Sequence, residues 1–136
     1  MSIANPYSQY MENQFKTATP GKLIVMAYDA AIRFARTAAE KMKVGRLDEQ
    51  SANIIKVQKI ILELISSLDS QADPALAANL EGLYMYVFDR LTFANVRDDQ
   101  AALEEAIRIL SDMRSVWAEA EHLVRSGKTS VEARAA

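Results

Sequence analysis

Apolar residues recur every three or four positions along most of the chain and are interrupted by short polar joints. The periodic stretches cover, approximately, residues 20–43, 48–69, 74–95 and 99–126. In the last stretch Leu103, Leu110 and Trp117 follow one another at intervals of seven, which places them on one face of a helix. Helices of similar length with short joints pack most readily side by side, each antiparallel to the next. The pattern predicts an all-α protein built as an antiparallel up-down four-helix bundle.

Residues at the joints mark where the helices begin and end. Thr19 and Asp73 each stand directly before a proline, so that the polar side chain caps the helix and the proline occupies its first turn. Asp98 or Asp99 is expected to cap the last helix in the same way. Gly45 follows the first periodic stretch and suits a helix stop, because glycine accepts left-handed backbone angles.

The chain divides into three segments on this pattern. Residues 19–126 form the bundle, and residues 127–136, which are mostly small, polar or alanine, are expected to be disordered. Residues 1–18 form an N-terminal segment that is too short and polar to be a stable helix alone. Its aromatic residues fall on helical spacing: Tyr7, Tyr10 and Phe15. We expect this segment to cover apolar surface of the bundle, either as a displaceable cap or as a permanent part of the core.

The second predicted helix carries more apolar surface than a bundle needs. Ile54 and Ile61 lie on its core line. Successive residues of a helix are rotated by about 100°, which places Ile55 and Leu62 about 80–100° around the helix from Ile54. Gln58 lies between the two stripes, where its amide could hydrogen-bond the backbone of a bound chain. Leaving a large apolar side chain in water forgoes about 1.5–3 kcal/mol relative to burial, so something is expected to cover this side.

The first predicted helix shows the same excess in its first half. Ile24 and Tyr28 fit a core face, whereas Leu23 lies on its flank. A tyrosine has an apolar body and a polar tip, so Tyr28 suits either a helix seam or a contact surface. We expect the two helices to form an apolar groove for a partner helix. The candidate groove residues are Leu23, Ile24, Tyr28, Ile54, Ile55, Gln58, Ile61 and Leu62. Three of them, Ile24, Ile54 and Ile61, would serve equally well as core.

Composition excludes most chemistry. Cysteine is absent and histidine occurs once, which excludes disulfides, thiolate catalysis and Cys/His zinc sites. Glu119 and His122 form one Glu-x-x-His pair, but a di-iron bundle needs two such pairs, and these two side chains point away from the core face. Arg114 and Glu121 lie near the core line and are expected to form a partly buried ion pair, within or between helices. We expect no enzyme activity, no metal and no cofactor.

Charge and hydropathy narrow the possible partners and location. The net charge of −2 provides no basic excess to neutralise phosphates, so nucleic acid is not expected as a partner. The longest apolar run, Leu23 to Tyr28, has six residues, against about eighteen needed to cross a membrane. No basic stretch precedes an apolar one near the start, as it would in a signal peptide. We expect a cytoplasmic protein that does not insert into membranes.

An ordered set of short segments runs through most of the chain. It includes Asn5-Pro6-Tyr7, Thr17-Ala18-Thr19-Pro20-Gly21-Lys22-Leu23, Tyr28-Asp29, the run from Ile55 to Leu64, Asn79-Leu80, and Arg114 with Trp117. No single segment is diagnostic, but the set, over about residues 5–120, resembles the FliS family, the cytoplasmic export chaperones of flagellin.

The resemblance implies a function for the excess apolar surface. FliS proteins are antiparallel helical bundles that bind the C-terminal segment of flagellin and prevent its premature polymerisation. The N-terminal segment of the chaperone occupies part of the empty groove, and the chaperone–flagellin complex is delivered to the flagellar export gate. The resemblance therefore implies flagellin and, through the complex, an export gate component as partners of a monomer or weak dimer.

Two other interpretations remain at this stage. The wide apolar stripes could form the seam of a permanent homodimer, in a helical adaptor or scaffold with no client to release. Alternatively, Glu119 and His122 could belong to a small enzyme or metal-binding bundle. Mass in solution tests the first interpretation, and metal content after purification tests the second.

Overall fold

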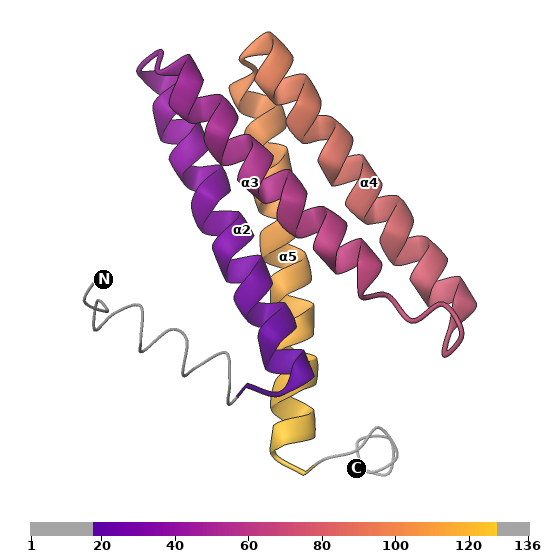
Figure 1. The fold of residues 1–136 in the computed structure, drawn as a ribbon. Coiled ribbons are helices and arrows are strands. Elements are labelled where there is room, and N and C mark those ends of the chain that lie inside the picture. Colours follow the sequence, from indigo (N-terminus) through magenta and orange to yellow (C-terminus); the bar gives the residue numbers. More distant parts are fainter. Residues whose placement is uncertain (1–17, 128–136) are drawn as a thin grey trace, which may run out of the picture.

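The chain folds as an up-down bundle of four α-helices (Figure 1). A computed structural model describes residues 18–127. The helices are α2 (Pro20–Lys43), α3 (Leu47–Ser66), α4 (Pro74–Arg97) and α5 (Gln100–Arg125). Helix α2 packs against α3 and α5, and α4 packs against the same two helices. The predicted fold class is therefore confirmed. The proposed cap residues Tyr7, Tyr10 and Phe15, and residues 128–136 of the proposed tail, lie outside the described residues.

Side-chain caps begin three of the helices where the sequence predicted them. Thr19 Oγ1 accepts a hydrogen bond of 3.1 Å from the backbone N–H of Lys22. Asp73 and Asp99 do the same at α4 and α5, accepting from Leu76 at 3.1 Å and Ala102 at 2.8 Å. Each cap satisfies a backbone donor that the helix leaves unpaired and contributes about 0.5–2 kcal/mol. Local chemistry thus sets the helix starts.

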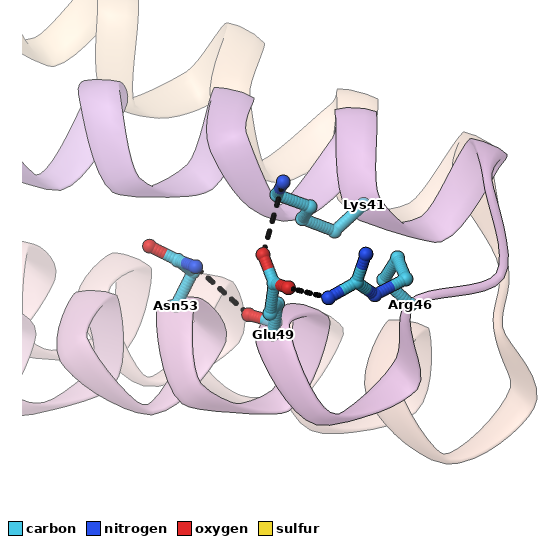
Figure 2. Close-up of polar contacts among 4 residues, drawn as sticks. All are labelled: Lys41, Arg46, Glu49 and Asn53. Atoms are coloured by element: carbon cyan, nitrogen blue, oxygen red, sulfur yellow. Dashed lines mark hydrogen bonds and ion pairs between the residues drawn. The ribbon is translucent and has the colours of Figure 1, made fainter.

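Polar contacts close the turn between α2 and α3. Gly45 adopts a φ of 73°, a left-handed conformation that glycine reaches without steric cost. Glu49, in the first turn of α3, pairs with Lys41 of α2 at 2.9 Å and with Arg46 in the turn (Figure 2). Asn53 donates to the Glu49 carbonyl at 2.8 Å. One carboxylate therefore ties the end of α2 to the beginning of α3.

The same end of the bundle contains a second polar network. The Gln50 side chain of α3 is buried and donates to Asp98 at 2.9 Å and to Asn95 at 3.2 Å, both at the end of α4. Gln100, at the start of α5, donates to the Ala39 carbonyl of α2 at 2.9 Å. These bonds link α3 to α4 and α5 to α2. The end of the bundle that carries the two short turns is thus held together by directional contacts.

The opposite end of the bundle is open. In Figure 1 the end of α3 and the start of α4 diverge from the start of α2 and the end of α5. The α3–α4 connection, residues 67–73, is longer than the other two and is organised by Asp69, whose carboxylate accepts from the backbone of Gln71 and Ala72. Because the two helix pairs separate here, side chains that would be central in a parallel-sided bundle line surface hollows instead.

A pair of tyrosines spans the centre of the bundle between α2 and α4. Tyr28 and Tyr84 are buried, and their hydroxyl oxygens lie 2.6 Å apart. Burial, and then the hydrogen bond to Tyr84, raise the pKa of Tyr28 well above its usual range; burial also raises the pKa of Tyr84. Both hydroxyls therefore stay neutral, and one donates to the other inside an otherwise apolar core.

Removing one tyrosine hydroxyl should destabilise the protein by more than the loss of that hydroxyl alone, because its partner stays buried without a hydrogen bond. Tyr84→Phe leaves the buried Tyr28 hydroxyl without its partner, so the free energy of unfolding should fall by about 1–3 kcal/mol. The double variant Tyr28→Phe, Tyr84→Phe leaves neither hydroxyl behind and should lose clearly less than the sum of the two single losses. Equilibrium denaturant unfolding of the four proteins measures this coupling, and strictly additive losses would contradict it.

Candidate functional site

The structure divides the eight predicted groove residues between core and surface. Tyr28, Ile54 and Ile61 are completely buried, with 0% of each residue exposed. They pack with α4 and α5 in the central cluster and present no surface to a partner. The prediction that these three residues line a surface groove is therefore wrong. In the described structure they are core residues, which their positions on the core lines of their helices also allowed.

Three of the predicted residues do lie at the surface. Leu23 is 37% exposed, Ile55 46% and Leu62 48%, all large apolar side chains. Their exposure agrees with the angular argument, which placed them beside the core line rather than on it. Ile24 is half-buried and packs against the core. Fewer of the predicted groove residues are exposed than expected, and the exposed apolar ones are those that flank the core lines.

Gln58 connects the exposed side of α3 to α4. Its side-chain N–H group donates to Thr92 Oγ1 at 2.8 Å and to the Phe88 carbonyl at 3.2 Å. Ile55 and Leu62 stand on the same side of α3 as Gln58, so they face the α4 side of the helix. Together Ile55, Gln58 and Leu62 form what we call the α3–α4 strip. Among the described residues the side-chain amide oxygen of Gln58 accepts no hydrogen bond, which leaves it for a bound backbone.

Leu23 lies on a different side of the bundle from this strip. It shares its face of α2 with Phe34, eleven residues later. The ammonium of Lys56, from α3, lies 5.1 Å from the centre of the Phe34 ring. The outer ridge of α3, with Lys56, therefore separates Leu23 from Ile55 and Leu62. The predicted residues form two apolar surfaces, not one groove.

A hollow of about 260 Å³ opens under the α3–α4 connection, and we call it the loop hollow. Its lining comes from all four helices and from residues 67–73. The apolar side chains in it are Ile24, Leu64, Leu68, Ala72, Leu76, Ala77, Leu80, Tyr84 and Trp117. Ile24 is the only predicted groove residue among them. The hollow exists because the helix pairs splay at this end, leaving apolar side chains uncovered within the described residues.

A second hollow, of about 500 Å³, lies between the start of α2 and the end of α5, and we call it the terminal hollow. Pro20 and Gly21 form one side, and Ala120 and Val124 form the other. Trp117 lines both hollows and so stands between them. The chain enters α2 through Thr19, which also lines the terminal hollow. Residues 1–17 are therefore attached at the edge of this apolar surface.

Sequence reasoning missed Trp117, Leu76 and Leu80 as surface candidates. Trp117 and Leu80 lie on the regular core faces of their helices, and periodicity assigns such positions to the interior. Only the divergence of the helices brings them to the surface. One signal was present: α4 carries apolar residues nearly all around, including the exposed Met85, Tyr86 and Phe93, and such a helix has more than one covered face.

The expected ion pair of Arg114 has a different partner. Arg114 Nε lies 2.8 Å from Asp29 Oδ1 on α2, not beside Glu121. Glu121 Oε2 instead lies 3.9 Å from Arg125 Nη1 on its own helix.

Glu119 and His122 are both exposed. In the part of the chain that the structure describes, no three His, Cys, Asp or Glu side chains gather closely enough to hold a metal ion. None of the four described helices has the length and apolarity that crossing a membrane requires.

Comparison with known proteins gives a consistent result. A crystal structure of a flagellar chaperone from bacteria superposes with a TM-score of 0.71 at 22% identity, covering 85% of this chain and 94% of that one. The flagellar secretion chaperone FliS of Bacillus subtilis is 36% identical over 120 residues, 88% of this chain and 89% of the relative. FliSB of Pseudomonas aeruginosa, also a flagellar secretion chaperone, is 31% identical over 118 residues, 86% and 94% of the two chains.

The fold is therefore that of a flagellar chaperone, an all-α bundle. The family described as flagellar protein FliS matches residues 3–124. The chain belongs to the FliS family, which is a family of chaperones rather than of enzymes. The resemblance inferred from the ordered segments is confirmed.

Neighbouring residues of α3 should respond very differently to truncation. Ile54→Ala removes a completely buried side chain and should lower the free energy of unfolding by about 2–5 kcal/mol. Ile55→Ala makes the same chemical change at a half-exposed position and should cost about 1 kcal/mol or less. Denaturant unfolding of the two variants provides the comparison. Equal losses would show that Ile55 is covered and does not belong to an open strip.

Proposed function

We propose that this protein is a cytoplasmic export chaperone that binds the C-terminal segment of flagellin. One observation chiefly supports the proposal. This chain belongs to the FliS family, and its described residues, 18–127, expose two apolar hollows and the α3–α4 strip. Surfaces of this kind mark binding sites on proteins that are otherwise well packed. Binding would keep flagellin from polymerising before export.

An amphipathic client suits the shape of these surfaces. The hollows and the strip are separate patches, so an extended chain with short helices could occupy them in turn, each helix placing apolar side chains on one patch. A client that orders on binding loses conformational freedom, which makes its affinity smaller than the contact area suggests. Moderate affinity suits a chaperone that must release its client at the export gate.

The N-terminal segment is the proposed competitor for the same surface. Residues 1–17 join the bundle beside the terminal hollow, and they carry Tyr7, Tyr10 and Phe15. When these side chains cover apolar surface of the empty chaperone, a client must displace them, and the net affinity falls by the free energy of the displaced contacts. In this proposal, the chaperone with its client then docks on a component of the export gate.

Client binding should depend on the α3–α4 strip. Titration calorimetry with the C-terminal segment of flagellin from the same organism should give one-to-one binding and a negative heat-capacity change, the marker of apolar burial. The double variant Ile55→Ser, Leu62→Ser should weaken this binding about tenfold or more, a loss of about 1.4 kcal/mol. Its melting temperature should change little, because both side chains are half-exposed.

The control for this variant is Val44→Ser, Val96→Ser, which removes two exposed apolar side chains from the closed end of the bundle. It should bind the flagellin segment like the unchanged protein. If wild-type protein fails to bind at tens of micromolar concentration, the proposed client is wrong. If both double variants lose affinity equally, the strip is not the contact.

Removing the N-terminal segment tests the proposed competition. A protein lacking residues 1–15 should bind the flagellin segment as tightly as the full chain or more tightly, because the client no longer displaces anything. Removal of residues 128–136 serves as the control for shortening the chain. Calorimetry of both proteins under the same conditions measures the effect, and weaker binding after N-terminal removal would mean that residues 1–15 contact the client directly.

A further inference from the structure

Positive charge is concentrated on one helix of an acidic protein. Helix α2 carries five basic residues, Lys22, Arg33, Arg36, Lys41 and Lys43, and two acidic ones, Asp29 and Glu40. Its formal charge is therefore +3, whereas the whole chain has a net charge of −2. Lys41 is used in the pair with Glu49 at the α2–α3 turn. The remaining basic groups have no comparable structural role among the described contacts.

Part of this charge lines a groove between α2 and α5. The groove has a volume of about 480 Å³. It is lined by Asp29, Ile32, Arg33, Arg36, Thr37, Glu40, Ser111, Arg114 and Ser115. None of the exposed large apolar side chains of the described structure is among them. The groove therefore differs in chemistry from the two apolar hollows and from the α3–α4 strip, and an apolar client does not fit it.

The geometry of Arg114 leaves its outer donors unused. Asp29 accepts from Nε of Arg114 at 2.8 Å and so fixes the direction of the guanidinium group. Among the described residues, the two terminal nitrogens of Arg114 make no hydrogen bond. An arginine fork of this kind matches the two oxygens of a carboxylate. Asp29 thus orients Arg114 for a second anionic partner and leaves the other end of the fork unoccupied.

Arg36 supplies a second cationic group in the same groove. It is exposed, and it takes part in no ion pair or hydrogen bond of the described structure. Arg33 also lines the groove, and its guanidinium carbon lies 5.2 Å from the centre of the Phe34 ring. The hydroxyls of Thr37 and Ser115 donate to backbone carbonyls of their own helices, which leaves the arginines as the main donors.

The negative groups in the groove do not cancel this charge. Asp29 is engaged with Arg114, and Glu40 lies one helical turn beyond Arg36. With three arginines and two acidic residues the lining has a formal charge of +1. Along α2 the groove extends from Asp29 to Glu40, roughly 17 Å at 1.5 Å per residue. Its length and its separated arginines suit an extended chain better than a single small anion.

We propose that this groove binds a carboxylate-rich segment of a partner protein. One carboxylate pairs with the terminal nitrogens of Arg114, and a second pairs with Arg36. The groove lies between α2 and α5, whereas the α3–α4 strip lies on the other pair of helices. The groove also shares no lining residue with either apolar hollow, although the terminal hollow lies between the same two helices, so an acidic partner can dock while a client occupies the strip and the hollows. The groove would be a second binding surface that does not depend on the identity of the client.

A short poly-glutamate peptide, blocked at both ends, is the probe for this proposal. NMR titration of the full chain at low ionic strength should shift the amide signals of Thr37, Ser111 and Ser115, and added salt should weaken the effect. Arg36→Glu should weaken peptide binding about five- to tenfold, since an attractive contact becomes repulsive. Arg114→Lys keeps the charge but loses the fork, and should also bind more weakly.

Lys59→Glu is the matched control, because it makes the same charge change at an exposed position of α3. This variant should bind the peptide within about twofold of the unchanged protein, since rim charges far from a contact have small effects. Equal losses in Arg36→Glu and Lys59→Glu, or shifts scattered over all four helices, would overturn the proposal. Inorganic phosphate that binds as well as the peptide would show an anion site and would also overturn it.

Discussion

The buried hydroxyls of Tyr28 and Tyr84 impose a constraint on the whole bundle. Each phenol must find a polar partner in an apolar interior, and the 2.6 Å hydrogen bond gives each hydroxyl the other as its partner. The pair links α2 to α4, two helices that are not neighbours in the bundle. The hydrogen-bonded side chains therefore set the distance between α2 and α4 at the centre of the bundle. On one side of this pair the helices pack closely, and on the other side they diverge.

The two ends of the bundle differ because different interactions dominate them. At the closed end, Glu49 contacts both Lys41 and Arg46 (Figure 2). Gln50 contacts both Asn95 and Asp98, so directional bonds hold the two short turns. At the open end, the hydrogen bonds of residues 67–73 are local, either within the connection or to the adjoining turns of α3 and α4. An end held loosely can repack around a bound chain at little cost, since stability is not uniform across a protein. The apolar hollows accordingly lie at the open end.

Local sequence chemistry predicted the fold well. Helix α2 begins and ends where the pattern placed it, and Thr19, Asp73 and Asp99 are the observed caps. Such features depend only on neighbours in the chain, so one sequence is enough to find them. The helical angle also placed Ile54 on the core line and Ile55 beside it, yet both were assigned to the groove, and only Ile55 is exposed.

The parts that sequence missed depend on how the helices cross. Trp117 lies at a regular core position, yet it lines two surface hollows because the helix pairs diverge. Crossing angles follow from the packing of side chains on several helices together, which periodicity along one helix does not contain. The same limit explains Arg114, whose partner Asp29 lies 85 positions away in the chain. Leu23 was assigned to one groove with Ile55 for the same reason.

The position of Trp117 has a practical consequence. The chain contains a single tryptophan, and its indole forms a wall shared by the loop hollow and the terminal hollow. Indole emission moves to shorter wavelength when water leaves its surroundings. Intrinsic fluorescence of the unmodified protein therefore reports on the wetting of both hollows at once, without any label. The single tryptophan thus gives an optical signal from the end of the bundle where the described residues leave apolar side chains uncovered.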